Sequence, residues 1–151
     1  INLVSFYIKD EDGIKQYGFE FNKQHIKVNI NDFSYEIDSI DNIEFLINEL
    51  GFNPNEKNII NEEQTSLHYA CGQAIKPSID KLIELGADLS LRDSAGRTPF
   101  DMMAFIKDEE VREEYSDEPE MLAKWDEAYD SVSKKVVNLE KKTVRHLRKQ
   151  Y

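Results

Sequence analysis

Residues 65–104 read TSLHYACGQAIKPSIDKLIELGADLSLRDSAGRTPFDMMA, and this stretch decides the fold. Thr65 and Thr98 lie 33 residues apart, and each begins a Thr-x-apolar step. Apolar residues recur at helical spacing from Ile79 to Leu85, and Gly86 is of the kind that commonly ends a helix. A period of roughly 20–50 residues is typical of stacked helical units. The stretch therefore predicts a short helical array.

The period and the turn residues together resemble the ankyrin repeat, because Thr65–Ala70 matches the Thr-Pro-Leu-His-x-Ala pattern of that family. One full repeat would span residues 61–93, with degenerate partial repeats on either side over roughly 39–115. Ser66 replaces the usual Pro, which indicates local divergence and not a different fold. The resemblance implies that His68 is a structural residue, hydrogen-bonded across neighbouring repeat loops.

The flanks of the full repeat are irregular. Gly51 and Gly86 occupy matching positions but lie 35 residues apart, so about two extra residues are expected around 55–60. Such an insertion would lengthen the projecting loop, or finger, between repeats. The outer helix of the last repeat should span 108–115, and the apolar Phe105 and Ile106 need something to cover them.

The N-terminal residues follow a different period. Apolar and polar residues alternate from Leu3 to Phe21, with an Asp-Gly step at Asp12-Gly13 that favours a hairpin, and alternation resumes over 26–37. We therefore expect residues 2–37 to form an antiparallel β-meander covered by the repeat helices. The predicted fold class is α+β: a short ankyrin-repeat helical array with an N-terminal antiparallel β-meander and a long C-terminal helix.

Residues 116–151 predict that long helix. Ser116 to Pro119 has a capping residue, early acids and a first-turn proline, and no Gly or Pro follows to Tyr151. Apolar or semi-apolar residues from Leu122 to Thr143 form a seam in steps of three and four. Three interpretations are open: the helix folds back over the last repeat, it self-associates as a coiled coil, or it serves as a basic partner-binding or membrane-surface helix.

The composition indicates one compact domain over 1–151, divided into a β-meander at 1–38, repeats at 39–115 and the helix at 116–151. Residues 1–118 carry a net charge of −14 and residues 119–151 a net charge of +3. The acidic body disfavours a nucleic-acid partner and could attract a basic one. No apolar run is long enough to span a membrane, so no membrane is expected. The single Cys71 suits a reducing, cytoplasmic compartment, and it should be a packed thiol.

No catalytic constellation is present. The three histidines are far apart in sequence, and no Gly-rich phosphate loop, nucleophile pair or metal-ligand spacing occurs, so we expect no enzyme activity, cofactor or metal. We also note that the chain begins at Ile1, which suggests a fragment.

The resemblance implies a protein-binding module acting through finger loops and inner helices. The partner-binding positions it implies are Asn61, Glu62, Gln64, Gln73, Ser94, Ala95 and Arg97. One version is an acidic, immunity-type inhibitor that neutralises a basic toxin. The alternative is a fragment of a secreted bacterial ankyrin-repeat effector that binds a host protein and is delivered into the host cell.

Overall fold

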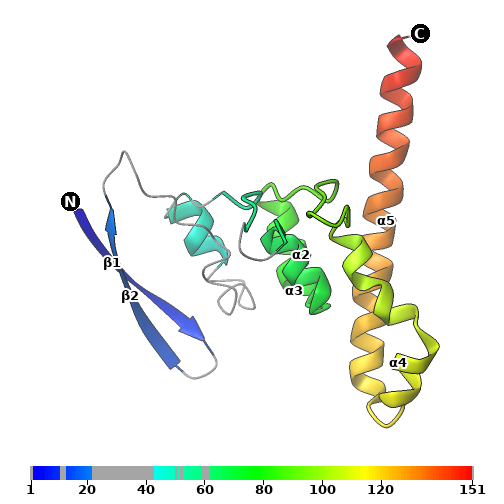
Figure 1. Ribbon diagram of the computed structural model, residues 1–151, viewed down its shortest axis with the longest axis horizontal. Helices are drawn as coiled ribbons and strands as arrows, with labels where there is room; N and C mark the ends of the chain where they lie inside the picture. The colour runs from blue at the N-terminus through cyan, green and yellow to red at the C-terminus, as the bar shows by residue number, and fades with distance from the viewer. Residues whose placement is uncertain are drawn as a thin grey trace.

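The computed structural model describes residues 2–10, 13–21, 43–49, 51, 53–58 and 62–150. Two strands come first, followed by helical segments that lead to one long helix at the C-terminal end (Figure 1). In chain order the elements are β1 Asn2–Asp10, β2 Gly13–Phe21, the π-helical turn η3 Phe45–Glu49, α2 Ser66–Gly72, α3 Lys76–Glu84, the 3₁₀ segment η4 Phe100–Lys107, α4 Glu109–Glu114 and α5 Pro119–Gln150.

The strands β1 and β2 pair only with each other. They form one antiparallel hairpin, with Asn2 opposite Phe21 and Asp10 opposite Gly13. Among the described elements, β1 and β2 contact each other extensively and neither has an extensive contact with a helix. Residues 22–37, where further strands were expected, lie outside the described residues.

The predicted α+β class with a β-meander is therefore wrong. Every described residue of the hydrophobic core belongs to the helical part of the chain, between Ile43 and Val132. The physical reason is that alternation is a local property, whereas a sheet layer needs several strands and a helical face packed on it. The protein is a helical array, with α2 packed on α3 and on η4.

Local signals place the helices of the full repeat. The Thr65 side chain accepts a hydrogen bond from the backbone N–H of His68, and the His68 ring bonds back to Thr65, so the pair forms a capping box at the start of α2. Gly86 has φ of +102°, a conformation that glycine adopts without strain, directly after α3. Asp108 caps α4 by accepting from the backbone N–H groups of Glu110 and Val111.

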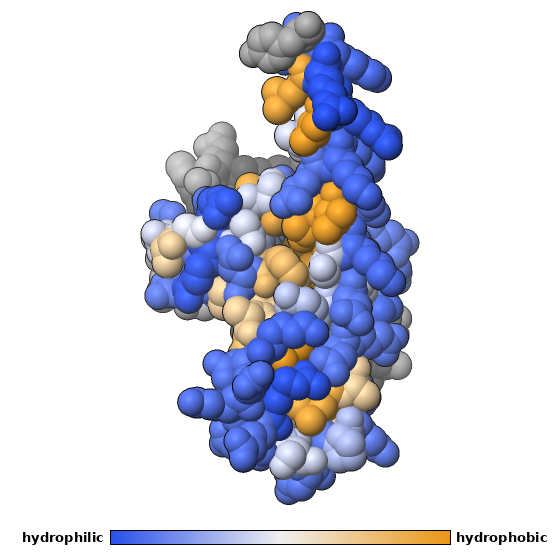
Figure 2. All heavy atoms as spheres, turned by 90° about the vertical axis from the view of Figure 1, so that its right-hand side faces the viewer, coloured by the Kyte–Doolittle hydropathy of each residue, from blue (hydrophilic) through white to orange (hydrophobic). Residues whose placement is uncertain are grey.

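The helix α5 folds back over the last repeat, which confirms the first of the three interpretations for its N-terminal half. It packs mainly against η4 and also contacts α3. The Trp125 ring lies edge-on to Phe105, with centroids 5.1 Å apart, and Ile106 is fully buried. Figure 2, which faces the α5 side, shows hydrophobic residues gathered beside this helix on a mostly hydrophilic surface.

Ion pairs fix the position of α5 against the array. Lys135 Nζ lies 2.5 Å from Asp80 Oδ1 on α3. Arg112 on α4 donates to both carboxylate oxygens of Asp126, at 2.8 and 3.0 Å. The bidentate geometry gives the second pair a defined orientation. The two ion pairs therefore attach α5 to the array at two positions along the helix.

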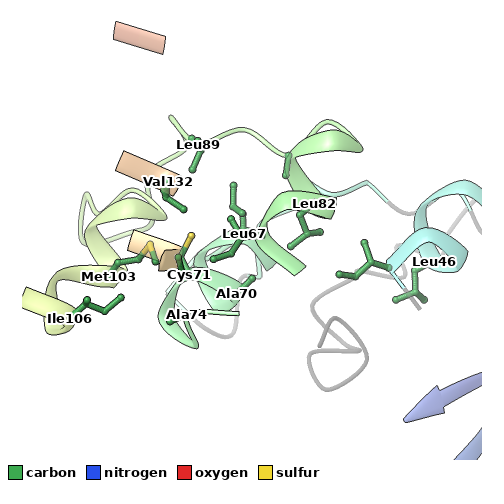
Figure 3. Packing of buried hydrophobic residues seen from close by; sticks show 14 residues of the cluster. Leu46, Leu67, Ala70, Cys71, Ala74, Leu82, Leu89, Met103, Ile106 and Val132 are labelled. Atoms are coloured by element: carbon green, nitrogen blue, oxygen red, sulfur yellow. The ribbon is translucent and has the colours of Figure 1, made fainter. Parts of the chain in front are cut away.

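The core brings together small and large side chains from several helical elements (Figure 3). Ala70, Cys71 and Ala74 on or next to α2 are buried and small, which allows α3 and η4 to approach α2 closely. Met103, where the repeat pattern has a small residue, is fully buried and fills space between η4 and its neighbours. Ala128 and Val132 bring α5 into the same cluster.

Candidate interaction surface at the finger loops

Two loops project from the array and are bonded to each other. The first ends at residues 62–64, and the second spans 92–97. The Ser94 backbone N–H donates to the Glu62 carbonyl at 2.8 Å, and Arg97 Nη2 lies 2.5 Å from Glu62 Oε2. We call the exposed or half-exposed residues of these loops, Glu62, Glu63 and Ser94–Arg97, the finger surface. Its two halves are thereby held in one fixed arrangement.

Asp93 is the buried anchor of the finger surface. Its Oδ1 accepts from the backbone N–H groups of Ala95 and Arg97, at 3.0 and 2.8 Å. Its Oδ2 accepts from Arg97 Nε at 2.9 Å and from Gln64 Nε2 at 3.1 Å. Burial alone would raise the pKa of this carboxyl, but the bonds from Arg97 and Gln64 outweigh it and lower the pKa to about 2. Asp93 therefore stays ionised and organises both loops.

The first loop turns through two strained residues. Glu62 and Glu63 have φ of +53° and +56°, which is uncommon for residues other than glycine. Hydrogen bonds between Asn58 and the far side of the turn hold them there: Asn58 N–H to the Gln64 carbonyl at 2.8 Å, and Glu63 N–H to the Asn58 carbonyl at 2.9 Å. Strain of this kind persists only where the surroundings over-determine the conformation. The turn thus presents two adjacent carboxylates.

His68 links α2 to the second loop from below. Its Nε2 lies 2.8 Å from the Arg97 carbonyl oxygen, and its Nδ1 lies 3.1 Å from the Thr65 backbone nitrogen. A carbonyl only accepts, so Nε2 carries the proton and Nδ1 accepts from Thr65. Burial lowers the His68 pKa, and the bond to the Arg97 carbonyl opposes this only in part. The ring is a neutral structural group, as the resemblance implied.

The predicted partner-binding positions differ in their exposure. Glu62, Ser94 and Ala95 are exposed on the finger surface, and Gln73 is exposed at the end of α2. Arg97 is 41% exposed but is engaged by Asp93 and Glu62. Their role in binding stays a prediction. Asn61 lies outside the described residues.

Gln64, one of the predicted partner-binding positions, is buried. It is 9% exposed, and its amide bonds to Asp93. The repeat pattern placed it in a variable loop, but the inter-loop bond draws it inward. Asp93, the residue that holds the site together, was not among the predicted positions, although an Asp three residues before Gly96 is a recognisable turn signal.

Two observations concern possible reactive groups among the described residues. Across the part of the chain that the structure describes, no three His, Cys, Asp or Glu side chains gather as metal ligands. Cys71 is buried, and burial raises the pKa of its thiol to about 12, so it is protonated and unreactive at neutral pH. None of the helices described is both long and apolar enough to cross a bilayer.

Comparison with known proteins gives likenesses in structure but none in sequence. No family model matches the chain, and no curated protein matches it. Among solved structures it is similar to the ankyrin repeat domain of Bcl-3, a protein described as a unique member of the IkappaB protein family. The two share 25% sequence identity over 46% of this chain, with a TM-score of 0.41. The match spans 30% of that domain.

Proposed function

We propose that this chain is a non-catalytic protein-binding module whose finger surface contacts another protein. The observation that carries the proposal is the bonding between the two loops. Ser94, Arg97 and the buried Asp93 fix exposed residues of both loops in one conformation before any partner arrives. Pre-organised loops lose little conformational entropy on binding. Strained loop conformations are commonly found at recognition sites.

The charges of the finger surface favour a basic partner. Arg97 is neutralised by Asp93 and Glu62, and Arg92 donates to the Gly96 carbonyl at 2.7 Å. Glu63 is exposed, and its carboxylate has no hydrogen bond or ion pair within the described residues. The two arginines therefore bond within the protein, and the Glu63 carboxylate remains available to a partner. The net charge of the chain, −11, would steer a basic protein toward it.

Two biological settings fit a basic protein partner. In the first, the chain is an immunity-type inhibitor that neutralises a basic toxin. In the second, it is part of a secreted bacterial effector that binds a host protein. A toxin gene beside the coding gene supports the first setting, and a longer reading frame with a secretion signal supports the second.

The proposal is tested by site-specific photo-crosslinking in the cell that makes the protein. A benzophenone amino acid replaces Ala95 on the finger surface, and a matched variant carries it at Glu113, which is exposed on α4. We expect a discrete crosslinked protein, identified by mass spectrometry, from the Ala95 position alone. Crosslinking of equal yield and identity from both positions, or from neither, would contradict binding at the finger surface.

Charge reversal then tests the chemistry of the partner. Glu63→Lys should weaken the captured complex about tenfold and leave the melting temperature unchanged, because the Glu63 carboxylate bonds to none of the described residues. Arg97→Glu is the contrasting variant: Arg97 contacts the buried Asp93, so its reversal should lower the melting temperature. Tighter binding by Glu63→Lys would refute a basic partner.

A further inference from the structure

The exposed hydrophobic side chains of this protein gather at one place. Within the described residues, the exposed large hydrophobics are Val137, Leu139, Val144 and Leu147, at 40–48% exposure, and all lie on the last turns of α5. From Leu139 to Gln150 the helix continues for about 17 Å, and Figure 1 shows this end rising beyond the array. The array therefore covers only the first part of the apolar face of α5.

The same part of α5 is strongly basic. Residues 134–150 contain seven Lys or Arg and one acid, Glu140. Lys135 is paired with Asp80, whereas Lys142 is exposed and forms no ion pair or hydrogen bond with the described residues. An apolar helix face bordered by unpaired cations is complementary to an anionic, partly apolar partner.

A groove lies where this end of α5 leaves the array. It has a volume of about 610 Å³ and runs between the 86–89 loop and α5. Ile83, Ala87, Leu89 and Leu139 supply apolar lining, while Lys135 and Lys142 supply cations from α5. Asp88 also lines it, but its carboxylate accepts from the backbone N–H and hydroxyl of Ser90. Of the exposed hydrophobic and cationic side chains at this end of α5, Leu139 and Lys142 line the groove, whereas Val137, Val144 and Lys141 line a separate depression.

We propose that this groove binds an acidic polypeptide segment of another protein, with apolar side chains against Leu89 and Leu139 and carboxylates directed to Lys142. The site is separate from the finger surface, because the two share no residue. A segment that places apolar residues on one side and acids on its border would match the groove, with its acids beside Lys142.

The geometry disfavours two other occupants of this groove. A bilayer is flat, and a flat surface laid on Leu139 and Lys142 would meet the 86–89 loop that forms the opposite wall. A second copy of residues 134–150 would bring another net charge of +6 against the first, which repels. A narrow acidic chain fits the concavity and neutralises the charge.

The test selects ligands from a phage-displayed library of random 16-residue peptides on the immobilised protein. We expect enriched peptides to be acidic and to carry apolar residues at helical or alternating spacing. Leu139→Glu and Lys142→Glu should each weaken their binding about tenfold or more. The matched control is Lys141→Glu, the same change one residue away and outside the groove, which should alter affinity less than about threefold. Circular dichroism confirms that each variant keeps its helix content.

Several outcomes would overturn this inference. They are the absence of any enriched peptide, enrichment of neutral or basic peptides, or equal loss of binding in the Lys141 and Lys142 variants. Two further measurements address the other occupants. Stronger binding to vesicles of 30% phosphatidylserine than to the selected peptides would identify a lipid surface, and dimerisation in sedimentation at the same concentrations would identify a second copy.

Discussion

Replacing Asp93 with asparagine removes one charge from the buried anchor and keeps its shape. The Asp93 pKa of about 2, against an ordinary value of 3.8, corresponds to about 2 kcal/mol of folding free energy at pH 7. Asparagine keeps Oδ1 for the two backbone bonds, but its NH₂ group then faces the donors of Arg97 and Gln64. Leaving those donors unpaired adds about 1 kcal/mol. We expect Asp93→Asn to lose about 3 kcal/mol in total.

Urea unfolding at several pH values measures this loss. With a urea slope of roughly 2 kcal/mol per molar, the midpoint should fall by about 1.5 M at pH 7. The folded-state pKa of Asp93 is depressed, so its contribution is complete above pH 3.8 and disappears as the pH falls through about 2. Roughly half of it should be gone by pH 3, and the gap between wild type and variant should narrow accordingly.

The control for this measurement is Asp130→Asn on the exposed face of α5, which should change stability by less than about 0.5 kcal/mol. A loss below about 1 kcal/mol for Asp93→Asn at pH 7 would refute the reasoning. So would a gap from wild type that is the same at pH 3 and pH 7, because the charge of Asp93 would then contribute nothing.

Three other predictions concern the array and its cap. Gly86→Ala should lower the free energy of unfolding by about 1–2 kcal/mol, measured by thermal unfolding, because φ of +102° strains any other residue. Gly72→Ala in α2 should instead raise it by up to about 1 kcal/mol. Equal effects of the two changes would contradict the backbone argument. Trp125→Ala should lower the free energy of unfolding by about 3 kcal/mol and speed amide exchange in α5, since the ring contacts η4. Val144→Ala on the exposed end of α5 should lower the free energy of unfolding by less than about 0.5 kcal/mol. Cys71 should react with a thiol reagent at pH 8 only as fast as the protein unfolds, and reaction in the folded state would disprove its burial.

Structural features that depend on residues close together in the chain could be predicted from the sequence. The end of a helix at Gly86 and the start of α5 near Pro119 both depend on the backbone chemistry of one turn. The same is true of the small Cys71, whose burial follows from the helical spacing of its neighbours. Predicting these features does not require knowledge of the tertiary packing.

The site and the fold class depend on contacts between distant residues, and there the predictions were less successful. Gln64 was expected in solvent but turns inward to Asp93, 29 residues away. Alternating residues near the N-terminus suggested a sheet layer, yet the described core is helical. Both errors have one cause: a local pattern states which residues are able to pair, but not which partner the folded chain brings to them.

The sequence by itself predicted a short helical array, a helix end at Gly86 and a long C-terminal helix, because each is encoded in spacing along a single segment. Only the tertiary structure decided where that helix is used. Its first half lies on η4, where Trp125 packs on Phe105 and Ile106 is fully buried. Its last turns pass beyond the array, and their apolar face remains exposed because no further repeat is present to cover it in the part of the chain described.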